Sequence, residues 1–162
     1  STANQKMSIK FVLLINKQGK IRMTKWYNSF GSVDDSKMTL SKQRAKLIRE
    51  VSQRVLTRSV RLSNVVEWRG MKLIYKKFAA LYFVFCCSNE DNELLMLQLI
   101  RTYVEILNDY FGTVSELDLV YNFDKAHCVL DELVCGGKIQ ESSKNAVLRA
   151  VKAHEAVESD RG

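Results

Sequence analysis

Residues 78–111 decide the fold, and they begin with Phe78-Ala-Ala-Leu-Tyr-Phe-Val-Phe-Cys-Cys87. A polar segment, Ser88-Asn-Glu-Asp-Asn-Glu93, follows. The stretch ends with Leu94-Leu-Met-Leu-Gln-Leu-Ile-Arg-Thr-Tyr-Val-Glu-Ile-Leu-Asn-Asp-Tyr-Phe111. Its first ten residues are mostly aromatic or branched, and they contain no Pro, Gly or charged residue. That composition is typical of a β-strand whose two faces are both buried.

The second part of this stretch has the apolar spacing of a helix. One apolar stripe is formed by residues 96, 99, 100, 103, 104, 107 and 111, and further apolar residues stand at 94, 95, 97, 106 and 110. A helix that is apolar nearly all round is covered on more than one side. We therefore expect one side to pack on the chain's own sheet and the other to meet a second protein.

The rest of the chain supplies further strands and helices around this stretch. Strands are predicted at 9–15, 20–27, 65–69 and 71–76, and helices at 39–58, 115–122, 123–135 and, from Ser142 or Ser143, to about 157. Thr39 or Ser41 is expected to cap the first helix, and Asp91 or Asn89 the long helix that Gly112 ends. The pattern predicts an α+β fold: a five-stranded, mainly antiparallel sheet flanked by helices.

The length of 162 residues fits one domain with a substantial core. We expect a flexible lead-in at 1–8, a single domain at 9–158 and a frayed tail at 159–162. No apolar run has the roughly 18–20 residues that span a bilayer, and the first run, 11–15, is too short for a signal peptide. The prediction is an intracellular protein without a membrane span.

Charge is distributed unevenly along the chain. Residues 1–77 hold 18 Lys and Arg against four Asp and Glu, whereas residues 78–162 hold seven against 14. The basic first half favours an acidic partner such as phospholipid head groups, nucleic acid or acidic peptide, although a solvated basic face would explain it too. Nucleic acid is the weakest of these options, because no recognised binding module is present.

Catalytic and metal-binding patterns are missing from the sequence. The four cysteines, Cys86, Cys87, Cys128 and Cys135, have no metal-ligand spacing and are interpreted as buried free thiols. His127 stands beside Cys128 on a predicted helix, where neighbouring side chains point in different directions. No phosphate loop or nucleophile elbow occurs. We therefore predict that the protein is not an enzyme and uses no cofactor or metal.

Several strings, in order from about Ile9 to Val151, resemble the small (sigma) subunits of the heterotetrameric clathrin adaptor complexes. They are Lys17-Gln-Gly-Lys-Ile-Arg-Met-Thr-Lys-Trp-Tyr27, Glu67-Trp-Arg69, Lys72-Leu-Ile-Tyr-Lys-Lys-Phe-Ala-Ala-Leu-Tyr-Phe83, Asp91-Asn-Glu93, Tyr103-Val-Glu-Ile-Leu107, Tyr110-Phe111, Glu116-Leu-Asp118 and Asn122-Phe-Asp-Lys125. Glu67-Trp-Arg69, Tyr75-Lys-Lys77 and Gly136-Gly-Lys-Ile-Gln-Glu-Ser-Ser-Lys144 are most similar to the trans-Golgi and endosomal adaptor. The plasma-membrane adaptor is the alternative.

The resemblance implies a longin-like fold and a large adaptin partner, gamma-type or, in the alternative, alpha-type. It implies a peripheral position on trans-Golgi, endosomal and coated-vesicle membranes through the complex. It also implies a site for cargo signals made of an acidic residue, three others, and Leu-Leu or Leu-Ile. The apolar pocket that the resemblance implies would be formed by Ala79, Leu81, Val104, Val114 and Leu119, with Thr113 at its rim.

Arg22 would supply the cation for the acidic residue of the signal, assisted by a basic residue of the large subunit. Some members of the family have Asn at the position of Thr113, so the side-chain contact that this Asn makes at the rim of the pocket is not implied for this chain. Two explanations without a ligand stay open for these residues. Leu81, Val104 and Leu119 would then be ordinary core residues, and Arg22 would be an exposed basic residue. A purely structural or regulatory longin subunit is the alternative function, and an unrecognised small hydrolase is a third.

Overall fold

The computed structural model describes residues 8–27, 39–59, 61–135 and 138–139. Its main sheet has five strands in the order β2-β1-β5-β4-β3, and every neighbouring pair is antiparallel. The strands are β1 (Ile9–Asn16), β2 (Ile21–Trp26), β3 (Val65–Trp68), β4 (Met71–Phe78) and β5 (Leu81–Ser88). The predicted five-stranded α+β fold is thus confirmed.

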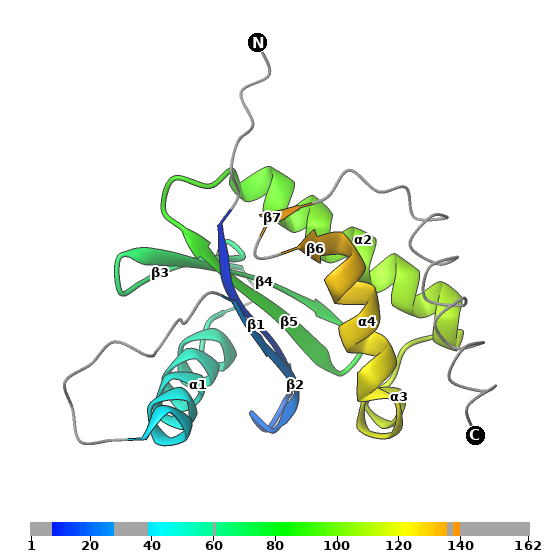
Figure 1. Cartoon of the computed structure of the whole chain (residues 1–162). Coiled ribbons are helices and arrows are strands. Elements are labelled where there is room, and N and C mark those ends of the chain that lie inside the picture. The colour runs from blue at the N-terminus through cyan, green and yellow to red at the C-terminus, as the bar shows by residue number, and fades with distance from the viewer. Residues whose placement is uncertain (1–7, 28–38, 60, 136–137, 140–162) are drawn as a thin grey trace, which may run out of the picture.

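Helices cover both faces of this sheet (Figure 1). Helix α1 (Leu40–Leu56) lies on one face, and α2 (Glu93–Phe111) and α4 (Phe123–Leu133) lie on the other, with the short α3 (Glu116–Tyr121) between them in sequence. Helix α1 connects β2 to β3, which are the two edges of the sheet, so the connection crosses the whole face.

The central strand β5 is buried on both faces, as its composition predicts. Phe83, Phe85 and Cys87 belong to the core under α2, whereas Val84 and Cys86 belong to the core under α1. This alternation follows from the two-residue period of a strand. Cys86 and Cys87 therefore point to opposite faces of the sheet.

The second side of α2 is covered by the chain itself over much of its length. Ile106, off the main apolar stripe, is fully buried because α4 packs along α2. Leu94 and Leu95, at the start of the helix, remain 76% and 38% exposed. Among the described residues, the exposed large apolar side chains of α2 therefore lie at its start, and the expected contact of this helix with a second protein stays a prediction.

Two predicted helix boundaries are wrong. The long helix is capped by Asn92, whose side chain accepts hydrogen bonds from the N–H groups of Leu94 and Leu95, and not by Asp91 or Asn89. The buried Asp91 carboxylate instead accepts from the N–H groups of Ser8 and Ser88, tying the start of the chain to the end of β5.

The helix predicted at 123–135 is also too long. Helix α4 ends at Leu133, and residues 134–135 form β6 (Val134–Cys135), which pairs antiparallel with β7 (Lys138–Ile139). The remaining boundaries agree closely, including the Thr39 cap and the Gly112 end. The short helix α3 begins at a capping box formed by Ser115 and Asp118. The last predicted helix, the tail at 159–162 and all of the lead-in except Ser8 lie outside the described residues.

Candidate functional site

Arg22 on β2 is bound by a carboxylate from a distant part of the chain. Its Nε and Nη2 atoms both lie 3.0 Å from Oε2 of Glu116, the first residue of α3. The two side chains are 24% and 30% exposed, so the pair is partly screened from water. Glu116 stands where the free N–H groups of a helix start favour negative charge.

Asn16 links this ion pair to the central strand. Its side-chain oxygen accepts from the N–H groups of Gln18 and Lys20, at 2.9 Å each, which fixes the β1–β2 turn. Its amide nitrogen donates to Glu116 Oε2 at 3.4 Å. Asn16 is paired with Leu81, the first residue of β5. The ion pair therefore lies at the end of the sheet where β5 begins.

Four of the predicted pocket residues lie in one continuous apolar core. Leu81 and Leu119 are 1% and 0% exposed, and Val104 and Val114 are each 3% exposed. Leu119 is on α3, the same helix as Glu116, so the predicted cation is held against the element that carries one of the predicted pocket residues. The surface over these four side chains is closed in this structure.

The other two predicted residues, Ala79 and Thr113, are exposed and stand in connections. Ala79 is in the β4–β5 turn with φ = 52°, a left-handed conformation that is uncommon for residues other than glycine. Thr113 follows Gly112, whose φ is 81°, in the connection from α2 to α3. The next residue, Val114, is held by a 2.9 Å hydrogen bond from its N–H to the Asn108 side chain.

Burial shifts the pKa values of one histidine and two cysteines. It lowers the pKa of His127, with nearby Lys25 adding to the effect, so the imidazole is neutral at neutral pH. The ring packs edge-on against Phe123 with centroids 6.1 Å apart. Burial raises the pKa of the Cys86 thiol, and raises that of Cys87 to about 12. These thiols are protonated and enclosed in the core.

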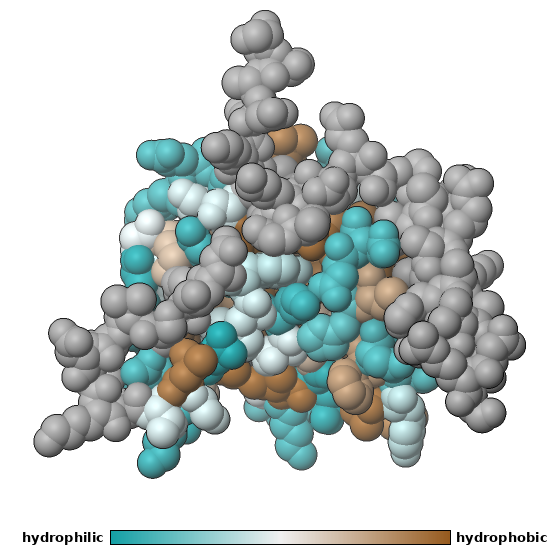
Figure 2. All heavy atoms as spheres, in the orientation of Figure 1, coloured by the Kyte–Doolittle hydropathy of each residue, from teal (hydrophilic) through white to brown (hydrophobic). Residues whose placement is uncertain are grey.

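Within the described ranges, no three or more His, Cys, Asp or Glu residues gather in a way that could hold a metal ion. In the same part of the chain, no helix is long and apolar enough to cross a membrane. Figure 2 shows polar and apolar side chains interspersed on one face of the molecule.

Glu116 and Asn16 are the residues that sequence reasoning missed. In the sequence, Glu116 fits the preference of a helix start for acidic residues, and its helix does begin at a capping box. Arg22 and Glu116 are separated by 94 residues, and no local pattern connects positions that far apart. The residues that follow Asn16 form a turn pattern, and its hydrogen bonds fit that turn, but the pattern does not indicate its contact with α3.

Comparisons with known proteins give one consistent answer. Residues 8–158 match the family model described as "Clathrin adaptor complex small chain". The "AP-1 complex subunit sigma-2" of Arabidopsis thaliana is 50% identical over 147 residues, which cover 91% of this chain and 85% of the relative. The "AP-1 complex subunit sigma-3" of Homo sapiens is 46% identical over 145 residues, covering 89% and 88% respectively.

The structural comparison agrees with the sequence comparisons. A chain of the "Homology model of the full-length AP-3 complex in a stretched open conformation" matches with a TM-score of 0.67 at 30% identity, covering 94% of this chain and 97% of that chain. The longin-like α+β fold implied by the resemblance is confirmed. This chain belongs to the family of clathrin adaptor complex small chains.

Proposed function

We propose that this protein helps to bind acidic dileucine signals of membrane cargo and stabilises the core of a heterotetrameric clathrin adaptor. Its likeness to AP-1 sigma subunits supports a place in the adaptor of the trans-Golgi network and endosomes. In that adaptor it would bind a gamma-type large subunit, and the complex would hold it at the membrane surface as a peripheral protein. An alpha-type partner in the plasma-membrane adaptor is the alternative.

The observation that carries the cargo proposal is the contact between Arg22 and Glu116. It sets a cation beside a helix whose Leu119 belongs to the same apolar core as Leu81, Val104 and Val114. A signal of this kind needs a cation for its acid and an apolar slot for its leucines. In an extended peptide the acid stands roughly 13 Å from the first leucine, at about 3.3 Å per residue.

Binding at this site requires two local rearrangements. The acid of the signal must replace the Glu116 carboxylate at Arg22, which exchanges one ion pair for another. The leucines must enter a surface that is closed here, by movement of the connection that contains Gly112, Thr113 and Val114. Assembly with the large subunit would supply the second basic residue and hold this connection open.

The energies fit weak and regulated binding. Two buried leucines contribute roughly 3–6 kcal/mol, and a partly exposed ion pair contributes about 0–1 kcal/mol. Ordering of the peptide and the loss of its free motion oppose these gains. We expect affinity in the micromolar range or weaker, so cargo capture would depend on several contacts to one membrane.

The test is binding of a labelled acidic dileucine peptide to the assembled complex with Arg22→Glu in this subunit. We expect binding to fall by at least tenfold while the complex still assembles on a sizing column. Lys42→Glu, the same charge reversal at an exposed position of α1 that is remote from both parts of the candidate site, is the matched control and should change affinity less than twofold. An unchanged affinity for Arg22→Glu would leave the purely structural role as the better account.

The closed surface over the four apolar residues favours that second role, a longin subunit that only stabilises its large partner. Val104→Asp combined with an assembly check separates the two functions. Loss of peptide binding by an intact complex supports cargo recognition. Co-purification of the large subunit, identified by mass spectrometry, distinguishes a gamma-type from an alpha-type partner.

A further inference from the structure

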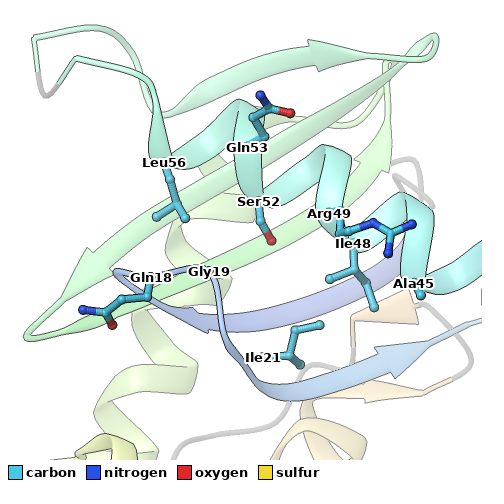
Figure 3. A pocket seen from close by; sticks show the side chains of 9 residues that line it. All are labelled: Gln18, Gly19, Ile21, Ala45, Ile48, Arg49, Ser52, Gln53 and Leu56. Carbon is cyan, nitrogen blue, oxygen red and sulfur yellow. The ribbon is translucent and has the colours of Figure 1, made fainter.

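A concave surface lies on the face of the sheet opposite the candidate cargo site, between α1 and the β1–β2 turn (Figure 3). It encloses about 470 Å³ and is lined by Gln18, Gly19, Ile21, Ala45, Ile48, Arg49, Ser52, Gln53 and Leu56. We call it the α1 groove. None of the residues proposed for cargo binding lines it.

The floor of the α1 groove is apolar and partly open to solvent. Ile21 is 37% exposed although it is a large apolar residue, and Ile48 and Leu56 are only half-buried at the edge of the core under α1. In Figure 3, Ile21 and Ile48 face each other across the groove. The space between them is suited to an apolar side chain from another molecule.

A polar group without a partner points into the same space. Ser52 is 7% exposed, and its hydroxyl has no hydrogen-bond partner in the described part of the protein. Figure 3 shows the hydroxyl directed from α1 toward the turn at Gln18 and Gly19. A buried hydroxyl without a partner is unfavourable, so a ligand that offers it a hydrogen bond gains from the contact.

The rim of the α1 groove is strongly basic. Arg49 lines it, and Lys17 and Lys20 flank the turn residues on the other side; all three are exposed. Glu50, the acidic residue of α1, is already engaged by Arg69 at 2.7 Å and by the Trp68 indole N–H at 2.8 Å. The cations at the rim therefore favour an anionic ligand.

From these features we propose that the α1 groove binds an acidic peptide segment of another protein. An apolar side chain fills the space between Ile21 and Ile48, carboxylates lie against Arg49 and the turn lysines, and a peptide amide bonds to the Ser52 hydroxyl. A lipid acyl chain would occupy the same space but would leave that hydroxyl without a partner. The groove chemistry therefore favours a peptide over a membrane surface.

The experiment uses the full chain and a fluorescent synthetic peptide with one central leucine between pairs of glutamates, with anisotropy as the readout. Arg49→Glu should weaken binding by at least tenfold, and Ser52→Ala by several-fold without lowering the melting temperature. Lys42→Glu is the control for net charge, because it makes the same reversal two turns away on α1, about 10 Å along the axis and outside the groove lining.

Four results would overturn the proposal. Equal loss with Lys42→Glu and Arg49→Glu would mean unspecific charge attraction, and an unchanged affinity after replacement of the leucine by serine would exclude the apolar slot. Phosphatidylserine vesicles that bind with the same dependence on Arg49 and Ser52, while the peptide does not bind, would indicate a membrane contact. Arg22→Glu should leave peptide binding unchanged; loss of binding there would place the peptide at the other site.

Discussion

The ion pair of Arg22 and Glu116 is the residue contact that bears most directly on the proposed recognition of cargo. Both donors of Arg22 reach the same carboxylate oxygen, and Asn16 donates to that oxygen as well. A carboxylate of this chain therefore holds the position that the acid of a signal would take. An acidic peptide has to compete with it, which lowers the apparent affinity of the subunit.

Replacement of Glu116 by Gln tests this competition. The amide keeps a hydrogen-bond acceptor but removes the negative charge, so Arg22 becomes available to the acid of the signal. Because a partly exposed pair contributes about 0–1 kcal/mol, we expect dileucine peptides to bind up to about fivefold more tightly. Titration calorimetry on the assembled complex measures the change. Weaker binding would mean that Glu116 orients Arg22 rather than competing for it.

Thiol reactivity gives an independent test of the core. Cys86 and Cys87 are fully buried with raised pKa values, whereas Cys128 is half-buried. At pH 8 a free cysteine is partly thiolate, the reactive form, and burial suppresses both ionisation and access. Timed alkylation followed by mass spectrometry should modify Cys128 long before Cys86 or Cys87. Equal rates under native conditions would contradict the two-sided burial of β5.

Local signals in the sequence define most of the elements, and the start of α2 shows where they are ambiguous. Asn89, Asp91 and Asn92 are all residues that commonly cap helices, and they stand within four positions of one another. The Asp91 carboxylate accepts hydrogen bonds from the N–H groups of Ser8 and Ser88, and the contact with Ser8 requires the first strand to be in place. Asn92 is then the residue that caps the helix.

The stability of two alanine variants should reveal which residue caps α2. Asn92→Ala removes the acceptor for two N–H groups and should cost about 1 kcal/mol in the free energy of unfolding. Asn89→Ala, at an exposed position in the preceding connection, should change it by less than about 0.5 kcal/mol. Urea unfolding curves measure both, and an equal effect would argue against the assigned cap.

The whole molecule has a three-layer arrangement in which the sheet is covered on both faces (Figure 1). One face carries α1 and the groove beside the β1–β2 turn, and the other carries α2, α4 and the candidate cargo site. The two proposed ligand sites thus lie on opposite sides of one rigid sheet. The start of α2, at the opposite end of that helix from α3 (Figure 1), exposes Leu94 and Leu95, the apolar surface that fits the predicted large partner.

Charge substitutions at the start of α2 test that partner surface. Leu94→Glu with Leu95→Glu should reduce co-purification of the large subunit several-fold, because two carboxylates would be buried against an apolar surface. Both side chains are exposed in the free chain, so its melting temperature should change little. Leu62→Glu, a similar change at a residue that is 52% exposed in a different loop, is the control. Normal assembly of the double variant would place the large subunit elsewhere.

The sequence by itself determined the elements and the family. The two-residue and 3.6-residue periods and the glycine after the long helix are local signals, and each predicted its element correctly. The apolar composition of 78–87 predicted a strand buried on both faces. These features depend on neighbours within a few positions, so they can be derived without a fold.

Only the tertiary structure decided which distant residues meet. The ion pair of Arg22 with Glu116, the use of Asp91 by the first strand, the cover of Ile106 by α4 and the α1 groove all join segments far apart in the chain. Such contacts arise when packing brings separate elements together, and no local pattern encodes their partners. For the same reason the resemblance in the sequence implied Arg22 as the cation for the signal, whereas the Glu116 carboxylate that binds Arg22 is known only from the fold.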